Sequence, residues 1–311
     1  MKKIMTVCGE IPPAQLGVTL PHEHIVCDLA RLSGTPDNRL DDLAACKQEV
    51  AYFKRAGGGT IVDVTTPDIG RNAAALREIS KATGIHLLAC TGYYLEQTMR
   101  EWVADKRIDQ LAAQMIREIT EGIGETGIKP GLIGELASAD HWIRPLEERV
   151  LRAAARAQKE TGLAISLHAA VGRPALDQLE ILREEGAVLE RVIVGHVDYE
   201  WHRRMFQDTD YYQKLLDAGC YLEFDQIGWG DAGMPEAERM KRILFLLGRG
   251  YGERLLLSSD LCRRSFYHQN GGRGYDNVIT SFIEQLQTIG ASPSQIRSML
   301  IDAPARALAI S

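Results

Sequence analysis

Eight short apolar runs recur along the chain, each about as long as a buried strand. They are rich in valine, isoleucine and leucine and lack regular alternation, which is typical of parallel strands covered on both faces. The runs cover residues 18–25, 60–66, 86–93, 131–136, 164–169, 191–197, 221–227 and 255–260. Between them, apolar residues recur every three to four positions, which predicts amphipathic helices.

Two of the intervening segments show the helical spacing clearly. Their apolar positions are Ile108, Leu111, Met115, Ile119 and Ile123 in one, and Val278, Phe282, Leu286 and Ile289 in the other. Strands alternating with helices predict an α/β fold, a (β/α)8 TIM barrel that forms a single domain over residues 1–311, with a short N-terminal β-hairpin around residues 9–17. A doubly wound open sheet is the alternative, but it gives no reason for polar residues at the ends of so many strands.

Ionisable residues close several of the predicted strands. His22 and His24 are two residues apart in the first run, so both imidazoles would point to the same face. Four later runs end in Glu135, His168, His196 and Asp260. The active site of such a barrel lies at the C-terminal ends of its strands, so these side chains should converge. Each alone has an ordinary structural explanation, but burying all of them together is costly unless metal ions compensate.

Four histidines and two carboxylates are too many ligands for one tetrahedral zinc ion. They suit two divalent ions, with Glu135 as the bridge, His22, His24 and Asp260 on the first ion, and His168 and His196 on the second. A hydroxide shared by the ions would be the nucleophile, because two metals lower the pKa of bound water toward neutrality. Asp260 is also placed to take the proton. Four imidazoles favour zinc, whereas the carboxylates would accept manganese or cobalt.

Composition narrows the function classes. A formal net charge of −6 and a pI near 5.8 argue against a phosphate-backbone partner, so we exclude nucleic acid. No run approaches the length of a membrane span, and the N-terminal residues lack the apolar stretch of a signal peptide. The six cysteines lack C-x-x-C spacing, as in a reduced protein. We therefore expect a cytoplasmic protein that acts on a small molecule.

Several segments match one known family in order and on the expected strands. They are Leu16-Gly17-Val18-Thr19-Leu20-Pro21-His22-Glu23-His24, Cys90-Thr91-Gly92-Tyr93-Tyr94, His168, Val194-Gly195-His196, Ser259-Asp260-Leu261-Cys262-Arg263-Arg264-Ser265 and Gly271-Gly272-Arg273-Gly274-Tyr275-Asp276. Over essentially its whole length the chain resembles the phosphotriesterase family of the amidohydrolase superfamily, most closely its phosphotriesterase homology (phosphotriesterase-related) branch. Much of that family bridges its metals with a carboxylated lysine, where this chain and the resembled branch have glutamate. The shorter arm of Glu135 implies a metal pair nearer the fourth strand or differently spaced, and a site that needs no carbon dioxide.

The resemblance leaves the substrate open. Many members of the family are lactonases or carboxylesterases, so we expect hydrolysis of an ester bond. Tyr94 matches a tyrosine that the family's lactonases keep beside the metals, although packing at the rim explains it equally well. An amidase of N-acyl amino acid-like amides and a phosphotriesterase are the enzymatic alternatives, and a metal-containing binding protein without turnover is the alternative from another class. Relatives are often homodimers, so a homodimer is expected.

A basic segment follows the eighth run. Arg263 and Arg264 come soon after Asp260, with Tyr267 and Arg273 beyond them. Arginines at an active-site mouth suit carboxylate, sulfonate or phosphate, so we expect these residues to bind an anionic or phosphorylated substrate. A salt bridge that braces the loop is an equal alternative. Trp229, in the seventh loop, is expected to wall the pocket or to pack in the lid or core.

Five further ionisable residues receive no role in the site. His86 begins a strand at the end away from the chemistry, and His141 and His202 lie in polar loops. Glu23 and Asp63 lie within strands beside the site, and we assign them structural roles.

Overall fold

The structure is a computed structural model that describes residues 2–139, 142–169, 174–199, 210–230 and 233–311. Each predicted apolar run contains a strand. The strands are β3 (Val18–Glu23), β6 (Gly58–Asp63), β7 (His86–Leu88), β8 (Cys90–Thr91), β9 (Leu132–Ala137), β10 (Ile165–His168), β11 (Val192–Gly195), β12 (Tyr221–Phe224) and β13 (Leu255–Leu257). β7 and β8 are the two halves of the third run, which is divided at Ala89.

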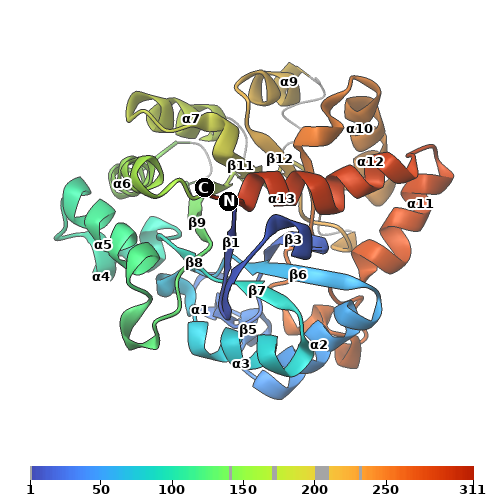
Figure 1. The fold of residues 1–311 in the computed structure, drawn as a ribbon, viewed down its shortest axis with the longest axis horizontal. Helices are drawn as coiled ribbons and strands as arrows, with labels where there is room; N and C mark the ends of the chain where they lie inside the picture. The colour runs from blue at the N-terminus through green and yellow to red at the C-terminus, as the bar shows by residue number, and fades with distance from the viewer. Residues whose placement is uncertain (1, 140–141, 170–173, 200–209, 231–232) are drawn as a thin grey trace.

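These strands form two parallel sheets that together make a barrel (Figure 1). One sheet has the order β3-β6-β7 and the other the order β8-β9-β10-β11-β12-β13. The seam between β13 and β3 is bridged by Ser258, whose hydroxyl oxygen lies 2.8 Å from the carbonyl oxygen of His22 and accepts from the backbone N–H of His22 (3.0 Å). The predicted TIM barrel is therefore confirmed.

Helices surround the strands and cover their outer faces (Figure 1). They are α2 (Leu43–Arg55), α3 (Ala73–Thr83), α4 (Glu96–Val103), α5 (Ile108–Thr120), α6 (Pro145–Thr161), α7 (Pro174–Glu184), α9 (Asp210–Asp217), α10 (Glu236–Gly248), α11 (Ile283–Thr288) and α12 (Pro293–Arg297). The predicted spacing in α5 is confirmed as far as Ile119, since the helix ends before Ile123. The last predicted helix begins as a π-helix over Val278–Phe282 and continues as α11.

Two short antiparallel hairpins lie outside the barrel sheet. The N-terminal one pairs β1 (Ile4–Thr6) with β2 (Gly9–Ile11), earlier than the predicted position. Pro12 and Pro13 have no N–H to donate to a ladder and instead begin a 3-10 turn, which ends the hairpin there. The second pairs β4 (Cys27–Asp28) with β5 (Arg39–Leu40) and was not predicted, because strands of two residues leave no apolar run.

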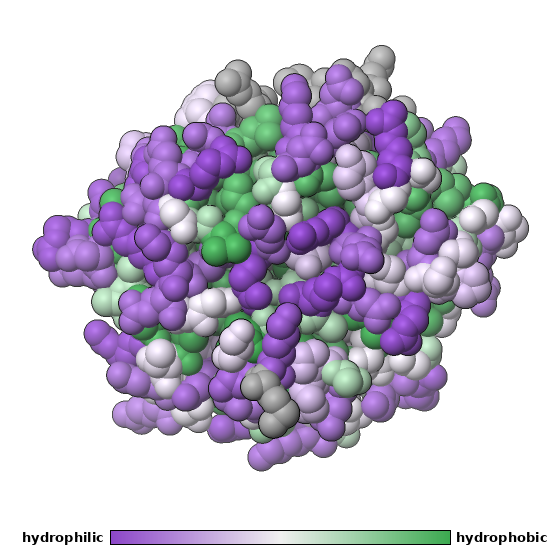
Figure 2. Space-filling view, turned by 45° about the horizontal axis from the view of Figure 1, so that its top comes forward, coloured by the Kyte–Doolittle hydropathy of each residue, from purple (hydrophilic) through white to green (hydrophobic). Residues whose placement is uncertain are grey.

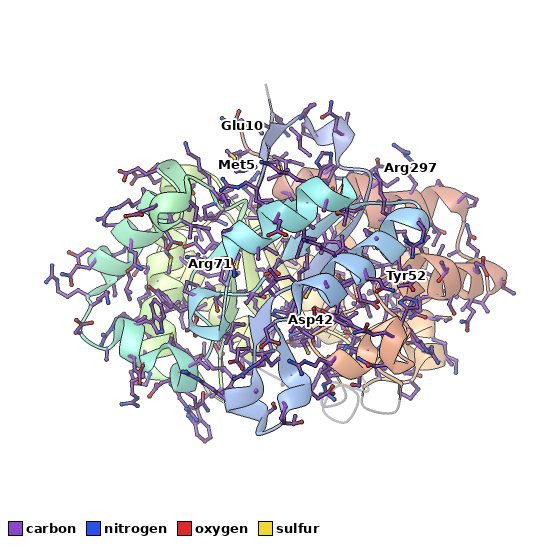
Figure 3. All side chains as sticks on the ribbon, turned by 90° about the horizontal axis from the view of Figure 1, so that it is seen from below. Met5, Glu10, Asp42, Tyr52, Arg71 and Arg297 are labelled. Carbon is purple, nitrogen blue, oxygen red and sulfur yellow. The ribbon has the colours of Figure 1, made fainter. Side chains whose placement is uncertain are left out.

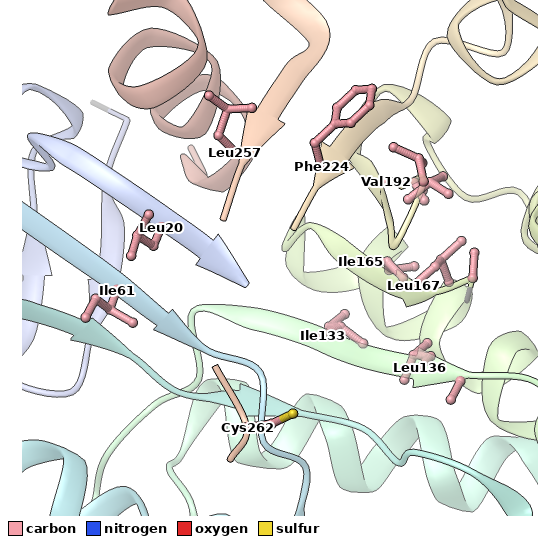
Figure 4. Packing of buried hydrophobic residues seen from close by; sticks show 14 of the residues in the cluster. Leu20, Ile61, Ile133, Leu136, Ile165, Leu167, Val192, Phe224, Leu257 and Cys262 are labelled. Carbon is pink, nitrogen blue, oxygen red and sulfur yellow. The ribbon is translucent and has the colours of Figure 1, made fainter. Parts of the chain in front are cut away.

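Apolar side chains pack in two layers. The outer layer, which includes Leu20 and Phe224, lies between the strands and the helices (Figure 4). The inner layer, which includes Val62 and Leu256, packs against Leu308 of α13 (Ala303–Leu308). α13 and the N-terminal segment thus cover this end of the barrel, and the polar residues lie at the opposite end.

The face shown in Figure 2 is mainly polar, with apolar side chains scattered among polar ones. Figure 3 shows the N-terminal hairpin, with Met5 and Glu10, at one end of the molecule. Among the described residues, no helix combines the length and apolar character that a membrane span requires. All six cysteines are free, and only Cys8 is exposed.

Candidate metal centre

Glu135 lies at the centre of the predicted ligands. Its Oε2 is 3.3 Å from His22 Nε2, 2.8 Å from His168 Nδ1 and 3.6 Å from His196 Nε2. Its Oε1 is 3.3 Å from His24 Nε2. The structure therefore brings these five side chains together at the C-terminal ends of the strands, and one carboxylate is shared between the two pairs of histidines.

Asp260 completes the set from the segment after β13. Its Oδ1 is 3.5 Å from His24 Nε2 and 3.9 Å from His22 Nε2. Asp260 and His196 have positive φ angles, of 45° and 56°. This left-handed conformation costs a residue with a side chain about 1–2 kcal/mol and persists only where its surroundings fix it. Both side chains are thus held toward the centre by the fold.

A β-bulge in β9 aims Glu135 inward. Between two successive paired positions, β9 carries one residue more than β10. Gly134 has a φ of 101° there, and a Cβ on it would lie 2.2 Å from the carbonyl oxygen of Ser166. The bulge therefore requires glycine, and bulges re-aim the neighbouring side chain.

The charges of the cluster favour a cation. Burial raises the pKa of Glu135, but the imidazoles of His22 and His168 outweigh it and hold that pKa well below its usual range. Burial lowers the pKa of His24, but Asp260 and Glu135 outweigh it and raise the pKa to about 9. The carboxylates thus draw positive charge onto their neighbours. Divalent cations provide that charge while leaving the imidazoles neutral, as metal ligands must be.

The donor set fits two ions side by side. One group of three donors is His22, His24 and Glu135, and another is Glu135, His168 and His196, each with its ligand atoms within 4.8 Å of one another. His22 Nε2 is buried and has no hydrogen-bond partner within the described part of the chain. Because both groups contain Glu135, two ions would share its carboxylate.

Residues behind the ligands orient the imidazoles. Asp225 Oδ1 lies 2.8 Å from the ring atom Nδ1 of His196, and Asp225 Oδ2 accepts from the backbone N–H of His196 at 2.8 Å. Thr65 Oγ1 lies 2.9 Å from His24 Nδ1. Such partners fix which ring nitrogen faces a metal. The sequence analysis assigned no role to Asp225 or Thr65. For Asp225 a signal was visible, because Glu223 and Asp225 form a pair of carboxylates on one face at the end of a strand.

Glu23 and Asp63, predicted to be structural, support the site directly. Glu23 Oε1 accepts from Ser259 N (2.7 Å), and its Oε2 accepts from Leu261 N (2.8 Å). Asp63 accepts from the N–H groups of Ile25 (2.8 Å) and Thr65 (2.9 Å). Glu23 therefore holds the segment around Asp260, and Asp63 holds the end of β3 and the turn that carries Thr65.

A pocket of about 380 Å³, which we call the substrate pocket, lies over the cluster. Its lining includes Glu135, Asp260, Tyr94, Trp229 and Arg263, and an apolar side formed by Leu29, Leu32 and Leu95. The Tyr94 hydroxyl is 3.3 Å from the ring nitrogens of His168. The Arg263 guanidinium lies 4.8 Å from the Trp229 ring centre, within cation–π range.

The other predicted substrate residues lie elsewhere. Arg264 donates to Asp41 Oδ1 (2.6 Å) and to a backbone oxygen of the β4–β5 hairpin. The buried Tyr267 hydroxyl lies 3.5 Å from Cys46 Sγ. Arg273 lines a second cavity. Of the unassigned histidines, His86 begins β7 away from the cluster, and His141 and His202 lie outside the described residues.

A barrel with histidines and carboxylates clustered at the C-terminal ends of its strands is typical of metal-dependent hydrolases. Comparison with known proteins supports this class. The model of the phosphotriesterase family, whose enzymes are binuclear metal hydrolases, matches residues 2–308. The chain therefore belongs to the phosphotriesterase family and is a hydrolase.

Three relatives indicate the range of activities in its neighbourhood. The phosphotriesterase homology protein of Escherichia coli (strain K12) is 38% identical over 290 residues, 93% of this chain and 97% of its own. A crystal structure of the Escherichia coli protein with phosphate in the active site has a TM-score of 0.88 at 37% identity and covers 94% of this chain and 98% of that one. The N-acetyltaurine hydrolase of Dictyostelium discoideum is 34% identical over 285 residues, 88% of this chain and 75% of its own. A lactonase from Listeria monocytogenes has a TM-score of 0.90 at 30% identity and covers 98% of both chains.

Proposed function

We propose that this hydrolase uses two metal ions to cleave the ester bond of a lactone or other carboxylic ester that carries an anionic group. The observation that carries the proposal is the position of Arg263, which lines the substrate pocket together with Glu135 and Asp260. Its Nε is buried and has no hydrogen-bond partner among the described residues. A guanidinium that stacks on Trp229 and keeps donors free suits a carboxylate, sulfonate or phosphate.

His22, His24 and Asp260 would hold one ion, and His168 and His196 the other, with Glu135 shared. When bound, two divalent ions, with zinc favoured by the imidazoles and manganese or cobalt compatible, would supply an activated water and polarise the scissile carbonyl. The Asp260 carboxylate faces the substrate pocket, where it can accept the proton of the attacking water. The Tyr94 hydroxyl, beside His168, can donate to an ester or leaving-group oxygen.

Hydrolysis of an acidic amide is the second candidate. The Dictyostelium discoideum relative is named for N-acetyltaurine, an amide that carries a sulfonate. The free guanidinium of Arg263 suits a sulfonate as well as a carboxylate. The apolar side of the substrate pocket, with Leu29 and Leu95, can take the acyl group in either case. The two candidates share the anionic group and differ in the bond cleaved.

The deciding experiment is a turnover screen of metal-loaded protein with Asp260→Asn as the blank. The substrates are matched neutral and anionic lactones, N-acyl amino acids, an acyl sulfonate amide and a phosphotriester. Metal-dependent turnover that prefers anionic esters supports the first candidate, and preference for acyl amides supports the second. Turnover of the neutral triester alone would overturn both. Retained metal without turnover in any arm would indicate a binding protein.

Arg263→Ala and Arg264→Ala form a matched pair that tests the anion contact. Arg263→Ala should raise KM about 10–100-fold for anionic substrates, since a hydrogen bond to a charged group contributes roughly 1.5–3 kcal/mol. Its effect on neutral analogues should be small. Arg264→Ala should spare both, because Arg264 pairs with Asp41 at the surface. Equal effects of Arg263→Ala on anionic and neutral substrates would contradict the assignment.

A further inference from the structure

Glu223, on β12, is a carboxylate buried deep in the barrel. Its exposed fraction is 0%, and neither of its side-chain oxygens has a hydrogen-bond partner within the described part of the chain. Burying a carboxylate costs free energy unless a partner compensates. A fold that keeps this group at its centre therefore indicates a role beyond packing.

The pleat of β12 aims Glu223 into the barrel. Tyr221 belongs to the inner apolar layer, whereas Leu222 and Phe224 belong to the outer one. Side chains alternate along a strand, so Glu223 and Asp225 share the inner face with Tyr221. Glu223 therefore lies one position deeper in the barrel than Asp225, which orients His196.

The imidazole of His22 lies between the metal centre and these two carboxylates. Its Nε2 is 3.3 Å from Glu135 Oε2 and 3.9 Å from Asp260 Oδ1. Its Nδ1 is 3.4 Å from Glu223 Oε2 and 3.3 Å from Asp225 Oδ2. One ring nitrogen of His22 thus faces the candidate metal ligands, and the other faces β12.

Of the two carboxylates, Asp225 is already engaged. Its Oδ1 lies 2.8 Å from Nδ1 of His196, and its Oδ2 accepts from the backbone N–H of His196. Glu223 has no competing partner of this kind among the residues described. The 3.4 Å to His22 Nδ1 is slightly longer than an N–H···O bond, so a small turn of either side chain would form one.

A glycine on β11 leaves room for this approach. A Cβ on Gly195 would lie 3.2 Å from His22 Nδ1 and 3.0 Å from Asp225 Oδ2, both closer than ordinary van der Waals contact. The space in which His22 meets the carboxylates of β12 therefore depends on glycine at this position. It is built from the strands of the barrel and not from a loop.

We propose that Glu223 is a positioning residue for His22, whose Nδ1–H its carboxylate accepts, so that Nε2 carries no proton and faces the ion assigned to it. A carboxylate behind a metal-binding histidine fixes the ring orientation and tautomer in this way. The inference rests on the proposed function for that ion. It gives His22 a partner of the kind that Asp225 provides for His196.

The test measures the affinity of each ion by competition with a chelator. Glu223→Met should lower the affinity for one of the two ions about 10–100-fold, the usual effect of losing a partner behind a ligand. Glu223→Gln should lose less, because its amide oxygen can still accept the N–H. Ser166→Ala is the matched control. The Ser166 hydroxyl is also buried without a partner in the described residues and lies two positions before His168 on β10, so both affinities should stay unchanged.

Two further readouts separate positioning from structural support. The melting temperature of metal-free Glu223→Met should not fall, because no hydrogen bond is lost and His22 keeps Glu135 and Asp225 at 3.3 Å. In zinc-loaded protein labelled with ¹⁵N-histidine, the Nδ1–H proton signal of His22 should move upfield in Glu223→Met, since its carboxylate acceptor is gone. The same signal should not move in Ser166→Ala.

Unchanged affinity for both ions in Glu223→Met would overturn the inference. A loss of affinity in Ser166→Ala as large as in Glu223→Met would overturn it too, as would a loss that comes with a lower melting temperature of the metal-free protein. Failure of the proposed function looks different. The turnover screen would then be negative for every acyl substrate, whereas the effect of Glu223→Met on metal affinity would persist.

Discussion

Replacement of Glu23 by glutamine should loosen Asp260 while the fold survives. The buried Glu23 carboxylate accepts from the hydroxyl groups of Ser258 and Ser259 and from Ser259 N, each at 2.7 Å, and from Leu261 N at 2.8 Å. These bonds lie on both sides of Asp260, whose positive φ of 45° needs such support. Asp260 thus depends on a carboxylate that is not itself among the candidate metal ligands.

The expected cost follows from these contacts. Glutamine keeps the shape of Glu23, but its NH₂ would face one of the N–H donors, for example that of Leu261. Leaving one buried donor without an acceptor costs about 1–3 kcal/mol, against a typical stability of roughly 5–15 kcal/mol, so the protein should fold. Loss of a partner behind a metal ligand typically lowers metal affinity about 10–100-fold, and we expect that range here.

Urea unfolding gives the free energy of unfolding, and competition with a chelator gives the metal affinity. Glu49→Gln is the matched control. Glu49 is also a buried carboxylate, which accepts from His268 N at 2.9 Å, but it lies on α2 away from the cluster. We expect a similar loss of stability in the control with unchanged metal affinity. Equal metal affinities in the two variants would refute the reasoning.

Three further outcomes test the centre and its support. In metal-free protein, the free energy of unfolding should fall by up to about 3 kcal/mol between pH 6.5 and 9, because His24 has a pKa of about 9 in the folded protein against 6.5 in the unfolded chain. Urea titrations of metal-loaded protein should lack this fall, and a rise in the metal-free protein would contradict the prediction. Arg239→Met should lower the free energy of unfolding, measured in urea, by about 3–5 kcal/mol, because it leaves the buried Asp198 carboxylate without its cation. A change below about 1 kcal/mol would show that the Arg239–Asp198 pair contributes little to stability. Gly134→Ala should lower metal occupancy measured by elemental analysis, since its Cβ would meet Ser166 O at 2.2 Å; full occupancy would mean that the bulge does not place the bridging carboxylate.

The strands and the clustered histidines and carboxylates followed from the sequence because both depend on local patterns. Strands covered on both faces must be apolar, so each barrel strand left a run of valine, isoleucine and leucine. An ionisable residue at the C-terminal end of such a run, like His168 or Asp260, is conspicuous because the surrounding residues are apolar. The convergence of these ends is a property of the barrel and not of any one strand.

The different roles of the two arginines and the bulge in β9 depend on contacts between distant segments. Arg263 and Arg264 are neighbours with the same charge, but Arg263 has an extended backbone, with φ −134° and ψ 141°, so successive side chains point in opposite directions. Only the backbone conformation of the loop decides that Arg263 lines the substrate pocket while Arg264 pairs with Asp41. The bulge at Gly134 is equally hidden, because one extra residue in a strand leaves the apolar pattern intact.

Closure of the barrel and assembly of the metal centre use the same residues. β13 and β3 are joined through Ser258, which bonds the backbone of His22, and through Glu23, which bonds Ser258 in turn. His22 and Asp260, two of the proposed ligands of one ion, lie on opposite sides of this seam, and the N–H of Asp260 donates to the carbonyl oxygen of His22 at 3.2 Å. An ion held by both would tie β3 to β13 directly. Metal binding should therefore stabilise this seam, and hydrogen exchange at the N–H groups of His22 and Asp260 should slow on metal loading more than exchange within the β6–β7 ladder, whose strands carry no proposed ligand.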